Sequence, residues 1–145
     1  MNFATKDGMW LQRSQLHILS TSMYPKSGYY IIQNQTNFIG RATEASDDLD
    51  PVVVFQGGAR VHQFLVERLG PSGSDGYFIY VDAIPTVKRG DKVFAAKGEG
   101  IPPSIWRIEA EEQAGEDMYI ISNQEGERWT VPDSHDPNQQ ASIDL

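Results

Sequence analysis

The chain of 145 residues contains no cysteine. This absence excludes a disulfide framework, a thiol nucleophile and any metal site built on thiolates. No apolar stretch approaches the roughly 18 residues that a transmembrane helix requires. The amino terminus also lacks the apolar segment of a secretory signal peptide. We therefore expect a cytoplasmic protein with no membrane partner.

Basic residues are scarce as well. Twelve lysines and arginines stand against twenty acidic residues, which gives a formal net charge of −8. The densest basic pair, Lys88 and Arg89, is followed closely by Asp91. A negative protein without a basic cluster repels phosphate backbones and anionic lipid surfaces. We therefore expect no nucleic acid among its partners.

Three segments, which begin at residues 28, 76 and 117, share one strand pattern. They read Gly-Tyr-Tyr-Ile-Ile-Gln-Asn, Gly-Tyr-Phe-Ile-Tyr-Val-Asp and Asp-Met-Tyr-Ile-Ile-Ser-Asn. Each is a run of aromatic and β-branched residues that ends in a small polar residue, which is typical of a β-strand. Self-similarity with a period of roughly 40 to 50 residues indicates repeated supersecondary units that share one core. The sequence thus predicts threefold pseudosymmetry.

Further strand candidates follow each of these segments, and turn residues such as Asp50-Pro51, Gly57-Gly58 and Pro102-Pro103 separate them. No window carries the sustained 3.6-residue periodicity of a helix. Four strands in each of three units predict an all-β fold, the β-trefoil, in which a six-stranded barrel is capped by three hairpins. The additional candidate strands are residues 37–41, 52–55, 63–67, 86–88, 92–96, 104–109, 127–131 and 141–145.

The third unit has only three candidate strands before Leu145. Its fourth strand can come from the N-terminal segment, because Met9-Trp-Leu-Gln-Arg13 resembles the fourth strands of the other two units. In a trefoil the last strand lies beside the first, so this segment would close the barrel. The alternative is an unrelated extension. We divide the chain into an N-terminal extension, residues 1–27, which contains this candidate strand, and a β-trefoil domain, residues 28–145.

Two short motifs, Phe38-Ile-Gly-Arg41 and Trp129-Thr-Val-Pro132, are the most distinctive in the chain. With several weaker stretches they resemble the basidiomycete (mushroom) serine protease inhibitors of the cospin type, which are β-trefoils. The resemblance runs from about Gly28 to Leu145, in the order and spacing of that family. The weaker stretches are Gly28 to Asn34, Val93-Phe-Ala95, Pro103-Ser-Ile-Trp-Arg-Ile108, Tyr119-Ile-Ile121 and Ala141-Ser-Ile143.

The resemblance implies non-covalent inhibition of a serine protease through a surface loop between the second and third strands of the first unit. We call this segment the reactive loop. A rigid barrel that holds such a loop extended lowers the ordering cost of binding in a protease cleft. The residues of the reactive loop are Arg41, Ala42, Thr43, Glu44, Ala45, Ser46, Asp47, Asp48, Leu49 and Asp50.

The composition of the reactive loop leaves its target open. A trypsin-type pocket binds arginine or lysine, and Arg41 is the only basic residue of the loop. The peptide bond between Arg41 and Ala42 would then be the P1–P1′ bond. The rest of the loop is acidic, which does not favour an anionic pocket. Leu49 would instead suit an apolar pocket of the chymotrypsin or subtilisin type. A solvated acidic loop without a target is the remaining interpretation.

Two other functions remain as alternatives. Many β-trefoils are lectins and bind glycans, although the Gln-x-Trp signature of the ricin B type is absent from this chain. Inhibition of cysteine proteases would use other loops, such as residues 57–60 or 98–103.

Catalytic and metal-binding patterns are missing. The run Asp47-Asp48-x-Asp50 does not fit an EF-hand, because valine and glycine stand at the positions that require glycine and glutamate. The histidines, His17, His62 and His135, lie on separate segments without zinc-site spacing. No Gly-x-Ser-x-Gly turn is present. We therefore predict that the chain is not an enzyme and has no metal or other cofactor.

One strand permits a prediction of burial from its alternation. Successive residues of a strand face opposite sides. Trp106 and Ile108 should therefore face the core, while Ile105, Arg107 and Glu109 face outward.

Overall fold

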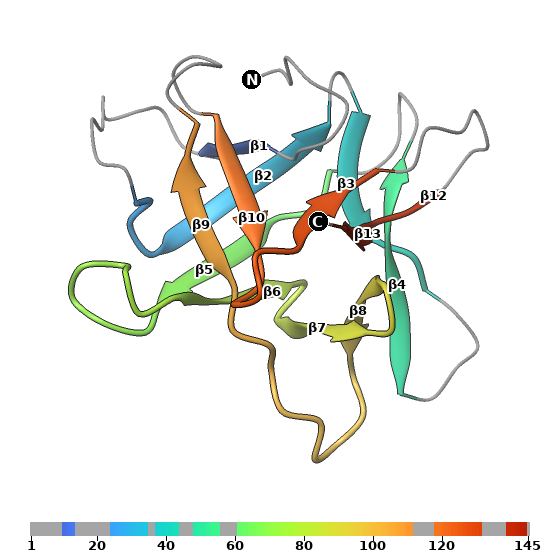
Figure 1. Cartoon of the computed structure of the whole chain (residues 1–145). Helices are drawn as coiled ribbons and strands as arrows, with labels where there is room; N and C mark the ends of the chain where they lie inside the picture. The colour runs from blue at the N-terminus through green and yellow to red at the C-terminus, as the bar shows by residue number, and fades with distance from the viewer. Residues whose placement is uncertain are drawn as a thin grey trace.

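The computed structural model consists of short β-strands joined by loops (Figure 1). It describes residues 10–13, 24–34, 37–43, 48–55, 61–111, 118–131 and 139–144. Within these ranges no residue is helical, and so no helix there is long and apolar enough to cross a membrane. The strands are β1 (Trp10–Arg13), β2 (Gly28–Asn34), β3 (Asn37–Arg41), β4 (Leu49–Phe55), β5 (Phe64–Arg68), β6 (Tyr77–Val81), β7 (Ile84–Arg89), β8 (Lys92–Ala96), β9 (Arg107–Ala110), β10 (Tyr119–Ser122), β11 (Arg128–Thr130), β12 (Gln139–Gln140) and β13 (Ser142–Asp144).

The strands pair antiparallel in one continuous sheet that closes on itself through β4. The second half of β4 pairs with β3, and its first half pairs with β8. Between β3 and β8 the order runs through β2, β5, β6 and β7. Closure of a sheet leaves few strand edges exposed to other chains. The prediction of an all-β fold is confirmed, and the division into three equivalent trefoil units stays a prediction.

The three repeated segments are strands, as their pattern predicts. They contain the whole of β2, β6 and β10. Alternate side chains of each strand are buried, as expected where one face of a strand packs against a core. The buried residues are Tyr30, Ile32 and Asn34 in β2, Tyr77, Ile79 and Val81 in β6, and Tyr119 and Ile121 in β10.

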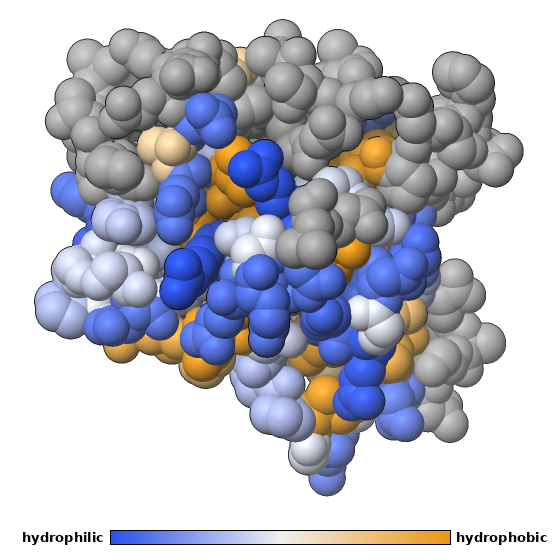
Figure 2. Space-filling model, viewed as in Figure 1, coloured by the Kyte–Doolittle hydropathy of each residue, from blue (hydrophilic) through white to orange (hydrophobic). Residues whose placement is uncertain are grey.

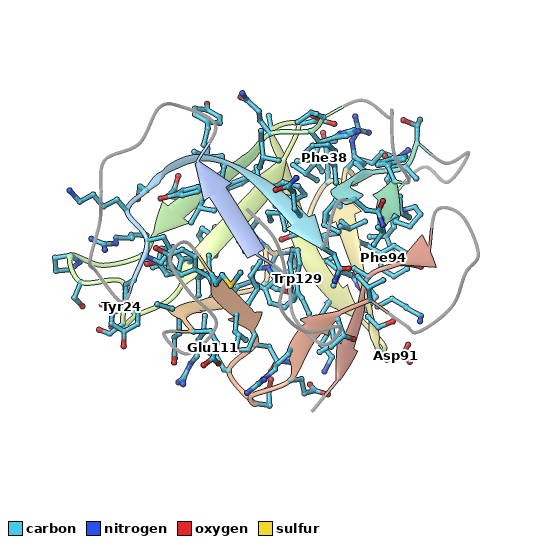
Figure 3. The ribbon with its side chains drawn as sticks, turned by 90° about the horizontal axis from the view of Figure 1, so that it is seen from above. Tyr24, Phe38, Asp91, Phe94, Glu111 and Trp129 are labelled. Carbon is cyan, nitrogen blue, oxygen red and sulfur yellow. The ribbon has the colours of Figure 1, made fainter. Side chains whose placement is uncertain are left out.

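The core centres on two tryptophans. Trp106, just before β9, and Trp129, in β11, are both fully buried. Their rings meet edge to face, with centroids 5.1 Å apart, a favoured aromatic geometry. Trp129 lies near the middle of the molecule seen from above (Figure 3). Trp106 and Ile108 are buried while Ile105, Arg107 and Glu109 are exposed, so the burial prediction is confirmed.

The predicted turn at Asp50-Pro51 is wrong, because both residues lie inside β4. Proline has no backbone N–H and is a poor ladder residue. Here its carbonyl is used instead, and it accepts a 3.0 Å hydrogen bond from the N–H of Ala42. The strand therefore begins at Leu49 rather than Val52, and Asp50 falls on its buried face.

The N-terminal strand β1 lies beside the first repeated strand. It pairs antiparallel with β2, with Trp10 opposite Gln33 and Arg13 opposite Tyr30. This is the place that the sequence predicts for a strand that closes the barrel. Whether β1 acts as the fourth strand of the third unit, and whether the domain begins at residue 28, stay predictions.

Candidate functional site

The two ends of the reactive loop are joined by backbone pairing. Arg41, the last residue of β3, lies opposite Val52 of β4. The hydrogen bond from Ala42 to Pro51 continues this pairing by one residue into the loop. Of the predicted site residues, the structure describes Arg41 to Thr43 and Asp48 to Asp50. Glu44, Ala45, Ser46 and Asp47 lie outside the described residues.

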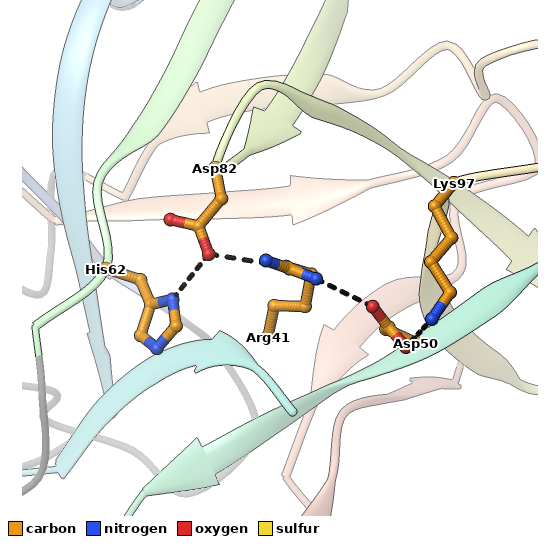
Figure 4. A network of polar contacts seen from close by, with 5 residues as sticks. All are labelled: Arg41, Asp50, His62, Asp82 and Lys97. Carbon is orange, nitrogen blue, oxygen red and sulfur yellow. Dashed lines mark hydrogen bonds and ion pairs between the residues drawn. The ribbon is translucent and has the colours of Figure 1, made fainter. Parts of the chain in front are cut away.

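Asp50 holds the base of the reactive loop with its buried carboxylate (Figure 4). Its side chain is 0% exposed. One oxygen accepts a 2.7 Å hydrogen bond from Nη1 of Arg41, and the other accepts a 2.8 Å bond from Nζ of Lys97. Charge-assisted hydrogen bonds of this length are among the strong ones in proteins. A buried carboxylate therefore links the two stems of the reactive loop to the end of β8.

Arg41 continues the network towards a second hairpin. Its Nε lies 3.3 Å from Oδ2 of Asp82, and the same oxygen lies 3.0 Å from Nδ1 of His62. The hydrogen bond with Asp50 is the main reason that the pKa of Arg41 is raised above its ordinary value. The side chain of Arg41 is only 21% exposed. Arg41 is thus held inside the protein by two carboxylates.

Asp82 is placed by a tight turn. Asp82 and Ala83 connect β6 and β7 and both have positive φ, 51° and 66°. Two successive residues with positive φ are typical of a type I′ hairpin turn, and aspartate tolerates this conformation better than most residues. The turn directs the carboxylate of Asp82 to Arg41 and His62. The ring of His62 in turn stacks on Phe55, with centroids 5.3 Å apart.

The other end of the reactive loop is fixed by its backbone. The carbonyl of Asp48 accepts hydrogen bonds from the N–H groups of Lys97, at 2.8 Å, and Gly98, at 3.1 Å. Leu49 follows as the first residue of β4 and lies opposite Ala96 of β8. Leu49 is half-buried. Both side chains that the sequence offers for a protease pocket, Arg41 and Leu49, therefore belong to the stems of the loop.

Sequence reasoning missed three members of this network, namely Lys97, Asp82 and His62. No local motif marks them, because each is brought to the loop by strand pairing over long distances in the chain. The burial of Asp50, in contrast, could have been predicted from the sequence pattern. Asp50 stands in phase with Val52 and Val54 at a spacing of two, so a strand extended through Pro51 would place it on the buried face.

The described part of the chain contains no candidate metal site. Its histidine and acidic side chains form no group of three or more that could hold an ion. His62 is engaged with Asp82. His17, His135, Asp47 and the alternative loop at residues 57–60 lie outside the described ranges.

Comparison with known proteins assigns the chain to a family of inhibitors. The model of the family Peptidase inhibitor I66 matches residues 23–145, and the chain belongs to this family. Because the family consists of peptidase inhibitors, the prediction that the chain is not an enzyme is confirmed. Its partner is accordingly a protease. No curated protein matches the sequence.

A solved structure shares the fold. The high-resolution structure of a proteinase inhibitor from Coprinopsis cinerea matches with a TM-score of 0.71 and 21% sequence identity. The match covers 83% of this chain and 84% of the other.

Proposed function

We propose that the chain inhibits a serine protease by placing the reactive loop, residues 41–50 of a β-trefoil, non-covalently in the enzyme's cleft. The observation that carries this proposal is the bridge by Asp50. One buried carboxylate holds Arg41 from the first stem of the loop and lies itself in the second stem, while Lys97 fixes it to β8. The base of the loop is therefore rigid before any partner arrives.

Rigidity at the base favours this mode of inhibition on physical grounds. A loop ordered in advance loses little conformational entropy on binding, so more of its contact energy appears as affinity. Protease–inhibitor interfaces bury about 1,600 Å² in total, which a loop and its neighbours can provide. An inhibitor also resists cleavage when its backbone is held on both sides of the bound segment.

The geometry of Arg41 favours a supporting role for its side chain. A trypsin pocket would have to draw the guanidinium away from Asp50 and Asp82. Removal of one member from a buried ion pair costs about 3 kcal/mol or more. We therefore propose that the tip of the loop, residues 43–47, enters the cleft and that Arg41 and Leu49 support it. Since the tip reads Thr-Glu-Ala-Ser-Asp, we expect inhibition of subtilisin or elastase rather than trypsin.

A panel of proteases tests the class of target. Trypsin, chymotrypsin, elastase, subtilisin, papain and legumain are assayed with the wild-type chain, beside a glycan array. We expect inhibition of subtilisin or elastase at submicromolar concentrations and weak or no inhibition of trypsin. Inhibition of papain or legumain alone, or glycan binding without any inhibition, would contradict the proposal.

An arginine scan of residues 43–47 tests the loop itself by a gain of activity. Arginine at the position that enters the specificity pocket should create trypsin inhibition, lowering the inhibition constant roughly a hundredfold, because the trypsin pocket pairs arginine with a buried carboxylate. The matched control is Ser72→Arg, which places arginine in the exposed loop between β5 and β6. It should leave trypsin inhibition at the wild-type level. A scan in which no position gains trypsin inhibition would show that another surface binds the protease.

A further inference from the structure

A second loop lies directly beside the reactive loop. Residues 97–104, here the second loop, connect β8 to the segment before β9 and project at the same end of the molecule as the start of β4 (Figure 1). The two loops share hydrogen bonds at their bases, because Lys97 and Gly98 both donate to the carbonyl of Asp48. A Cβ added to Gly98 would lie 2.6 Å from Oδ1 of Asp48, so a larger residue at position 98 would require the side chain of Asp48 to shift.

The second loop is fixed at both ends. At its start, Nζ of Lys97 is bound to buried Asp50. At its end, the N–H of Ser104 donates to the carbonyl of Thr86, and its hydroxyl accepts from the N–H of Lys88 at 2.9 Å. Pro102 and Pro103 restrict the backbone between these anchors. The second loop is therefore ordered in advance, as the base of the reactive loop is.

The side chains of the second loop are of the kinds found where one protein binds another. Glu99 and Pro102 are exposed and Ile101 is half-buried between them. In Figure 2 the lower end of the molecule accordingly shows hydrophobic side chains next to hydrophilic ones. Interfaces are built in this way, with an apolar centre and a polar rim.

We propose that the second loop is a secondary contact for the same protease molecule that the reactive loop binds. This inference rests on the proposed function. A protease covers about 800 Å² of its inhibitor, far more than the tip of one loop. Because the bases of the two loops are hydrogen-bonded to each other, an enzyme seated on the reactive loop also covers the second loop. Two enzymes cannot occupy the two loops together, so the complex contains one protease for each inhibitor.

The variant Pro102→Asp tests this contact, with Pro71→Asp as the matched control. Both prolines are exposed, and Pro71 belongs to the loop between β5 and β6, which lies apart from the second loop in Figure 1. We expect Pro102→Asp to raise the inhibition constant for subtilisin about tenfold, as loss of one well-buried interface contact does. Pro71→Asp should change it less than about twofold. Equal melting temperatures of the two variants show that the effect is not a loss of fold.

The outcomes separate this inference from the proposed function. If a variant of the arginine scan gains trypsin inhibition while Pro102→Asp inhibits subtilisin like wild type, the proposed role of the reactive loop is supported and the proposed secondary contact is wrong. If wild type inhibits no protease of the panel, both fail. Light scattering of the chain with an excess of subtilisin and elastase gives the stoichiometry. One protease per inhibitor is expected, and a complex that holds both enzymes would overturn the inference.

Discussion

Replacing Asp50 by alanine should lower the free energy of unfolding by about 3 kcal/mol, because it leaves two cations at a buried site without their shared partner. The two cations are Arg41 and Lys97, whose side chains are 21% and 26% exposed. Chemical denaturation measures the change. The control is Glu109→Ala, since Glu109 is an exposed carboxylate on β9, and it should alter stability by less than about 0.5 kcal/mol.

The same variant should weaken inhibition. Without Asp50 the stems of the reactive loop keep their backbone pairing but lose the carboxylate that links Arg41 to Lys97. The loop then has more conformations to lose on binding, and we expect the inhibition constant for subtilisin to rise about tenfold or more. Inhibition is measured at a temperature well below the melting temperature of the variant, so that the variant is folded. Inhibition equal to that of wild type would show that the bridge contributes to stability alone.

Trp106→Ala should have the largest effect on stability, a loss of about 4 kcal/mol. The side chain is fully buried and packs edge to face against Trp129. Domains of this size are stable by only about 5 to 15 kcal/mol. The variant should therefore unfold at a much lower denaturant concentration than wild type, as circular dichroism will record.

A pair of milder variants separates packing from hydrogen bonding at this site. Nε1 of Trp106 donates to Oγ1 of Thr86 at 2.9 Å, whereas Nε1 of Trp129 has no partner among the described residues. Trp106→Phe should therefore cost about 1 kcal/mol more than Trp129→Phe, because only the first breaks a buried hydrogen bond. Equal costs would mean that this hydrogen bond adds nothing to the packing of the two rings.

The strands could be predicted from the sequence because their signal is local. Runs of aromatic and β-branched residues mark β2, β6 and β10. The alternation of side chains along a strand assigns Trp106 to the core. The start of β4 could not be predicted in this way. Pro51 is typical of the end of a strand, but in the fold its carbonyl accepts a hydrogen bond from Ala42 and it pairs with Phe94 of β8.

The ion pairs of the reactive loop could not be predicted, because they depend on which strands become neighbours. Arg41 reaches Asp82 from another hairpin, and Asp50 meets Lys97 because β4 pairs with β8. A reading of the loop by composition treats Arg41 as the residue for a protease pocket. In the fold its guanidinium is already bound to two carboxylates. The sequence therefore predicts the loop, and tertiary contacts indicate the part that each of its described residues plays.

The most direct test of this account replaces residues 43–47 by Gly-Ser-Gly-Ser-Gly and leaves Arg41, Asp50 and Lys97 in place. The inhibition constant for subtilisin is then measured together with the melting temperature. We predict that inhibition is lost while the melting temperature stays within a few degrees of wild type, because the bridge and the core are untouched. Undiminished inhibition by this variant would contradict the account, since the protease would then bind without the tip of the reactive loop.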